Sequence, residues 1–172
     1  MKTPAEDLLN KLTVWMSDFL EQPNTALGSF AVCPYARAAR VNNRIEFKYC
    51  TVSEFMEVLR EGMNDLDDKE VVVIAFDHTT IDPVTLQEWV ENVNRTALMP
   101  LNYVVLEDHP DAPEYVNGVR MNFGHCGLLI LQRLDTLNAA ADRLREQGYY
   151  DSWDQQSLDS VVAWRYIHNA IC

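Results

Sequence analysis

The sequence lacks the short motifs that mark the commonest enzyme sites. It contains no Gly-x-Gly-x-x-Gly, no Gly-x-x-x-x-Gly-Lys and no Gly-x-Ser-x-Gly, so dinucleotide binding, P-loop chemistry and a hydrolase nucleophile elbow have no support. No two of its four cysteines share a Cys-x-x-Cys spacing, which removes the zinc-knuckle and dithiol-oxidoreductase signatures. No internal repeat or low-complexity tract is present. These absences leave function to be argued from individual residues.

Positive charge is also scarce. Fourteen Lys and Arg stand against 26 Asp and Glu, giving a formal charge of −12, and a field of this sign repels phosphate backbones and anionic lipids. No apolar run reaches the roughly 18 residues that span a bilayer, and residues 1–7 lack the basic start of a secretory signal. We therefore expect a cytoplasmic protein with reduced cysteines. Its expected partners are a small molecule or a protein, and not nucleic acid or membrane; a homo-oligomer stays open.

The chain of 172 residues predicts a single α/β domain. N-terminal helices are expected in 1–43, an α/β core in 44–148 with a loop insertion at 107–126, and a C-terminal helix in 149–172. Alternating or β-branched runs predict four strands, the first at an edge and the second at the centre of the sheet: Arg44–Cys50, Val71–Phe76, Leu101–Leu106 and Gly127–Leu131.

Helices are predicted from apolar periodicity and capping residues. They cover 5–21, 35–41, 52–64, a segment from Pro83 to before Pro100, 135–147, and a last helix with Leu158, Val161, Trp164, Ile167 and Ile171 inward. The order βαβαββα is similar to the thioredoxin-like fold, with another open α/β sandwich as the alternative. Pro100, just before the third strand, resembles that fold's cis-proline, although a proline that simply ends a helix is the alternative.

Two cysteines are candidates for a reactive thiol. Cys33 precedes Pro34 at a predicted helix start, with Arg37 and Arg40 one and two turns away, and both features favour a thiolate. The other interpretation is a small apolar plug. Cys50 begins a Cys-x-x-Ser at the position where a thioredoxin-like fold places its redox cysteine; here the other interpretation is a buried strand residue.

The 107–126 segment is longer than a connection between two strands requires, which is typical of functional loops. We predict His109 and His125 as catalytic residues together with Cys33, and Cys33, His109, His125 and Cys126 as ligands for zinc or iron. Solvated loop histidines are the alternative. Asn117-Gly118 predicts a small hairpin within the segment.

Recognition of a small polar substrate is predicted for a second group of residues. A carboxylate-bearing ligand suits their hydrogen-bonding and cationic side chains, which are Arg37, Arg120, Asn122 and Tyr115.

Four short motifs resemble an uncharacterised bacterial family of unknown function. They are Trp15, Cys33-Pro34-Tyr35-Ala36, His109-Pro110-Asp111 and the Leu-rich segment from Asn122 to Arg133. Members of that family carry an early Trp, a Leu-Cys-Pro-Phe-Ala motif, a His-Pro-Asp and an Asn-Arg-x-Pro segment, although residues 123–127 here lack its prolines. The resemblance implies that Cys33, His109 and Asn122 belong to one site.

The sequence therefore supports two functional hypotheses. The first is a small thiol- or metal-dependent protein of small-molecule metabolism, with a pocket formed by the Cys33 helix start and the 107–126 loop. The alternative is a non-catalytic acidic interaction or adaptor protein that uses the C-terminal aromatic residues Tyr149, Tyr150, Trp153 and Trp164. A concave pocket lined by Cys33 and the loop would favour the first, and an aromatic patch the second.

Overall fold

A four-stranded mixed sheet organises the computed structural model, which describes residues 3–167. The strands are β1 (Ile45–Tyr49), β2 (Val71–Phe76), β3 (Tyr103–Asp108) and β6 (Gly127–Arg133), in the order β1-β2-β6-β3. β1 and β2 are parallel, and β6 is antiparallel to both of its neighbours. The α/β class is thus confirmed, with β1 at an edge and β2 inside the sheet as the patterns predict.

The helices are α1 (Pro4–Trp15), α2 (Ala36–Val41), α3 (Phe55–Asp65), α4 (Pro83–Val93), α5 (Leu134–Glu146), α6 (Gln155–Leu158) and α7 (Trp164–Ile167). Short 3-10 or π-helical turns extend or join them at Met16–Leu20, Thr25–Leu27, Val52–Glu54, His78–Thr80, Asn94–Leu98, Met99–Leu101 and Asp159–Ala163. Two helix starts have the capping residues that the sequence predicts, whereas α5 has Arg133 and not Asp135 as its N-cap residue. Thr51 and Glu54 form a capping box. Asp82, the N-cap residue directly before Pro83, accepts a hydrogen bond from Thr85 N at 3.0 Å.

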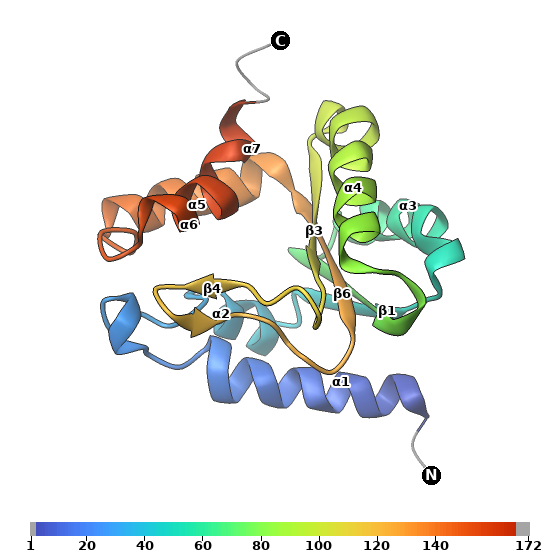
Figure 1. The fold of residues 1–172 in the computed structure, drawn as a ribbon, viewed down its shortest axis with the longest axis horizontal. Helices are drawn as coiled ribbons and strands as arrows, with labels where there is room; N and C mark the ends of the chain where they lie inside the picture. The colour runs from blue at the N-terminus through green and yellow to red at the C-terminus, as the bar shows by residue number, and fades with distance from the viewer. Residues whose placement is uncertain (1–2, 168–172) are drawn as a thin grey trace.

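Helices cover the two faces of the sheet in different ways (Figure 1). α3 and α4 pack on one face, where their apolar stripes meet side chains such as Ile74, Phe76 and Leu131. On the other face α1 and α2 cover β1 and β2, whereas α5 and α7 pack near the start of β3. One close contact fixes a residue type: a Cβ on Gly127 would lie 2.1 Å from Phe76 Cζ, so the central strand pair accepts only glycine there.

The thioredoxin-like arrangement is not confirmed, and one of its supports is wrong. β6 lies between β2 and β3, an order that local sequence patterns do not encode. Within residues 3–167 no peptide bond is cis, so Pro100 is trans and belongs to the 3-10 turn at Met99–Leu101. The expected last helix is divided into α6, a π-helical turn and α7, and its Ile171, like Cys172, lies outside the described residues.

Candidate functional site

Cys33 lies in the turn before α2, where burial outweighs the helix start. Tyr35, not Cys33, is the N-cap residue. Burial of the Cys33 thiol raises its pKa, and this effect exceeds the lowering by the backbone N–H groups of Tyr35 and Ala36; the nearby Glu21 carboxylate raises the pKa further. The predicted nucleophile is therefore a protonated thiol at neutral pH.

Arg40, one of the two arginines expected to stabilise a Cys33 thiolate, pairs with a carboxylate instead. Arg40 donates from Nε and Nη2 to the two Glu21 oxygens, at 2.6 and 2.9 Å, and the Glu21 side chain is only 5% exposed. The Arg40 hydrogen bond, with a smaller contribution from the Arg37 charge, lowers the pKa of Glu21. Sequence reasoning missed Glu21 because no local motif connects it with a partner 19 residues away.

The other two described cysteines are also unreactive by environment. Cys50 and Cys126 are buried, and burial raises the pKa of each thiol to about 11. Cys50 is thus a buried residue at the end of β1, the second of its two interpretations.

His109 is a buried structural residue whose two ring nitrogens both have partners. Nδ1 accepts from Asp111 N at 3.1 Å, so the hydrogen is on Nε2, which lies 2.9 Å from Ile81 O and 3.2 Å from His78 O. The ring ties the 107–126 loop to the segment that precedes α4. With both nitrogens engaged, His109 offers neither a lone pair to a metal nor a base to a substrate.

His125 is exposed and packs against Phe123, with ring centroids 5.0 Å apart. Within the described part of the chain, no three His, Cys, Asp or Glu side chains lie close enough together to hold a metal ion. The expected zinc or iron ligands are therefore not brought together: Cys33, His109 and Cys126 are buried or partly buried, His125 is exposed, and the four do not converge.

Asn122 organises the loop from within. Its Oδ1 accepts from Glu114 N and its Nδ2 donates to Asp108 Oδ1, both at 2.8 Å, while Asp108 Oδ2 accepts from Phe123 N at 2.8 Å. Its Nδ2 also lies 3.3 Å from His109 O, so Asn122 and His109 are neighbours, as the family resemblance implies, without Cys33. These bonds occupy the groups that we expected to bind substrate.

Of the remaining predicted binding residues, Arg37 is exposed on α2 and the other two lie at the surface of the loop. Arg120 donates from Nη2 to Pro110 O at 3.0 Å, and Tyr115 is exposed. The hairpin predicted from Asn117-Gly118 is confirmed as β4 (Tyr115–Val116) and β5 (Val119–Arg120), with both turn residues at positive φ.

Asn117 also fastens the hairpin to distant segments. Its Nδ2 donates to the carbonyls of Ala26 and Ser152, and its Oδ1 accepts from Asp154 N at 3.2 Å. The hairpin therefore lies between the N-terminal helices and α5–α6, as Figure 1 shows.

A groove of about 1220 Å³ lies beside this loop. It is lined by α4, the end of β3, the loop and the C-terminal helices. Leu106 and Glu107 lie on opposite faces of β3 and both line the groove, so the groove extends around the outer edge of this strand. Its apolar lining includes Trp15, Leu106, Ile130, Trp153 and Trp164. The loop and the C-terminal tryptophans thus share one concave surface, which Cys33, His125 and Cys126 do not line.

The groove is strongly acidic. Among residues 3–167, one arginine, Arg95, lines it together with six carboxylates: Glu91, Glu107, Asp108, Asp111, Glu114 and Asp159. Burial raises the pKa of Glu107 to about 7, and repulsion by Glu114 and Glu91 adds to the effect. Burial likewise raises the pKa values of Asp108 and Glu114. Carboxylates that are partly buried and repel one another favour a cationic ligand.

Asn94 closes the outer edge of β3 beside the groove. This residue is 3% exposed, and its side chain donates from Nδ2 to Val105 O at 2.8 Å and accepts from Val105 N at 2.9 Å. It therefore takes the place of a neighbouring strand at Val105. The sequence contains a local signal for this role: Asn94 follows Val90 by four residues, so a polar residue continues the apolar stripe of the helix.

Comparison of the chain with protein-family models, curated proteins and solved structures finds no match. The resemblance drawn from the Cys-Pro-Tyr-Ala and His-Pro-Asp motifs therefore stays a prediction. Separately, no helix among residues 3–167 combines the length and apolar character needed to cross a membrane.

Proposed function

We propose that this chain is a non-catalytic binding protein, and that its acidic groove receives a segment of a partner protein carrying basic and apolar side chains. The observation that carries this proposal is the lining of the groove, which combines six carboxylates and one arginine with apolar side chains that include three tryptophans. Charge complementarity of this kind selects and steers partners more than it adds affinity.

The size of the groove favours a peptide segment over a small metabolite. Pockets for small molecules typically enclose about 300–1,000 Å³, and this groove is larger, at about 1220 Å³. Tryptophans are enriched among the residues that dominate binding energy at protein interfaces, and Trp15, Trp153 and Trp164 all line it. These tryptophans also pack against core residues, so they are held in place before a partner binds.

The mode of binding follows from Asn94. An added strand would need the outward N–H and C=O of Val105, and the Asn94 side chain already bonds both. The partner segment therefore binds through its side chains, with its cationic groups near Glu91, Glu107 and Glu114 and its apolar groups against the tryptophans of the groove.

A thiol- or metal-dependent reaction has less support from the same groups. The three described cysteines all have raised pKa values, and both nitrogens of His109 are engaged. A nucleophilic or metal-binding cysteine needs a lowered pKa, and a histidine that binds a metal or acts as a base needs a free ring nitrogen.

The test is a titration of the protein with a short labelled peptide of interspersed Lys and Leu, followed by fluorescence anisotropy and tryptophan emission. A matched peptide with Glu in place of Lys is the ligand control. We expect saturable binding of the basic peptide, weakened about threefold to tenfold by Glu107→Gln with Glu114→Gln. Affinity should rise between pH 6 and pH 8, since Glu107, with its pKa near 7, gains its charge over this range.

Glu57→Gln is the matched protein control, because Glu57 is an exposed carboxylate on α3 that does not line the groove. It should leave binding unchanged. Equal losses in Glu57→Gln and in the groove variant would show general attraction to an acidic protein, and the absence of saturable binding to any basic peptide would refute the proposal.

A further inference from the structure

β1 is one of the two edge strands of the sheet and pairs only with β2 among residues 3–167, so its backbone groups point outward at alternate residues. Cys50 N donates to Ala75 O at 3.1 Å and Arg44 O accepts from Glu70 N at 2.8 Å, so the even-numbered residues face β2. Successive residues of a strand turn their backbone groups to opposite edges. Ile45, Phe47 and Tyr49 therefore present N–H and C=O groups outward, and no side chain among residues 3–167 bonds them.

The sequence of this edge is self-complementary. We propose that β1 pairs with β1 of a second copy of this chain, antiparallel and centred on Phe47. In this register Phe47 lies opposite itself, Ile45 opposite Tyr49, and Glu46 opposite Lys48 of the second copy.

Charged side chains normally protect an edge strand from pairing. Here they are arranged symmetrically about Phe47, with a negative charge at Glu46 and a positive charge at Lys48, so each Glu46 lies opposite a lysine of the second copy rather than another carboxylate. Lys48 Nζ already lies 2.9 Å from Asp65 and 3.6 Å from Glu61, and Lys69 lies 4.0 Å from Glu46. Glu46 of the second copy therefore joins an existing network of charges.

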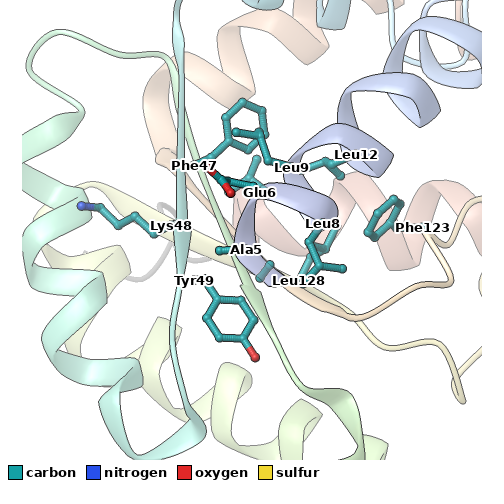
Figure 2. Close-up of a pocket in the computed structure, with 12 residues that line it drawn as sticks. Ala5, Glu6, Leu8, Leu9, Leu12, Phe47, Lys48, Tyr49, Phe123 and Leu128 are labelled. Carbon is teal, nitrogen blue, oxygen red and sulfur yellow. The ribbon is translucent and has the colours of Figure 1, made fainter. Parts of the chain in front are cut away.

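The apolar side of the same edge is incompletely covered. Figure 2 shows Phe47 and Tyr49 on the side of β1 that faces α1, and Lys48 on the opposite side. Tyr49 is 47% exposed and Leu9 of α1 is 39% exposed, and beside them lies a cavity of about 160 Å³ whose floor includes Val73 and Leu128. Exposed apolar surface of this kind marks an interaction site when it is contiguous.

The symmetry of the pairing covers this surface. A two-fold axis through the Phe47 pair, perpendicular to the sheet, keeps both α1 helices on the same face of the joined sheet. Tyr49 of each copy then lies opposite Ile45 of the other, so the second strand covers part of the exposed Tyr49 side chain. A second copy thus satisfies the backbone pairing, the charge pattern and the apolar cover at once.

The first experiment is sedimentation equilibrium of the full chain over a wide concentration range. We expect a monomer–dimer equilibrium, and about tenfold weaker dimerisation for Glu46→Lys, which places two lysines opposite each other at two symmetric positions. The double variant Glu46→Lys with Lys48→Glu should recover part of the loss, because it restores opposite charges across the interface.

The second experiment tests the register. Phe47→Cys should form a disulfide between two copies on mild oxidation, since residues directly opposite each other lie about 5.5 Å apart at Cα, within disulfide range. Tyr49→Cys is the matched control: it lies opposite Ile45 and should not crosslink to itself. The wild-type chain controls for the native cysteines.

A protein that stays monomeric at every concentration would overturn the proposal. So would a dimer that is insensitive to Glu46→Lys and forms no disulfide between two copies of the Phe47→Cys variant, since it would use another surface. The half-exposed Glu46 position keeps the test valid if Phe47→Cys fails to fold. None of these outcomes depends on the groove.

Discussion

The two edges of the sheet are protected in different ways. At β3 the buried Asn94 bonds both outward backbone groups of Val105, and the loop and α4 flank the strand. At β1 no side chain of the described residues does this, and the edge carries Glu46 and Lys48 instead. One edge is closed by a side chain that imitates a strand, and the other is left able to pair.

The difference shows why the groove and the open edge are separate surfaces. Closing β3 at Val105 prevents strand addition beside the groove, so a ligand there is selected by side-chain chemistry. Leaving β1 open makes backbone pairing available only at the far side of the sheet. Single substitutions at the two edges should therefore change the free energy of unfolding by different amounts.

The largest effect is expected for Asn94→Ala. Removing the amide leaves the buried N–H and C=O of Val105 without partners, and we expect the free energy of unfolding to fall by about 3 kcal/mol. Urea denaturation followed by circular dichroism measures this change. Asn92→Ala, at an exposed position two residues away, is the control and should cost less than about 0.5 kcal/mol. A loss below about 1 kcal/mol for Asn94→Ala would show that the edge does not depend on this side chain.

A smaller effect, dependent on pH, is expected for Glu107→Gln. The pKa of Glu107 is raised by burial to about 7 in the folded chain, from an ordinary value of 4.5, so the folded state binds more protons than the unfolded state between these values. The free energy of unfolding of the wild type should therefore fall as pH rises from about 4.5 to 7. We expect the variant to be more stable than the wild type at pH 8 by about 2 kcal/mol, after allowance for partial solvent screening.

Urea titrations at pH 5 and pH 8 measure this difference. Glu46→Gln on the open edge is the control, with a change below about 0.5 kcal/mol at either pH. An equal effect of pH on wild type and Glu107→Gln would mean that this carboxyl is not desolvated.

The smallest effect is expected for Lys48→Met on β1. Its contacts with Asp65 and Glu61 are partly exposed to solvent, so their removal should cost no more than about 1 kcal/mol and less at high salt. Denaturation at low and high salt measures it. A loss comparable with that of Asn94→Ala would mean that the charges hold β1 in place, and the contrast between the edges would fail.

Much of the secondary structure could be predicted because it depends on neighbours in the sequence. The Asn117-Gly118 hairpin, the Thr51–Glu54 capping box and the alternation of β1 all act within a few residues. The position of β6 between β2 and β3 could not be predicted, since it depends on packing between segments far apart in the chain.

The site was harder to predict for the same reason. The helix-start effect on Cys33 has the expected direction, because the N–H groups of Tyr35 and Ala36 lower its pKa, but burial outweighs it. The carbonyl partners of His109 Nε2 lie about 30 residues away, at His78 and Ile81, and no local pattern reveals that they engage this nitrogen. Asn94 was the residue most open to prediction, as a polar side chain on an apolar stripe.

The order β1-β2-β6-β3 places the open edge and the groove at opposite ends of the sheet. A dimer joined through β1 would carry two grooves at the outer ends of one continuous eight-stranded sheet, facing apart and both unobstructed. Such an assembly is bivalent. A partner with two basic segments on a linker of matching length would bind the second groove at the effective concentration set by that linker, and avidity would then exceed the affinity of either groove alone.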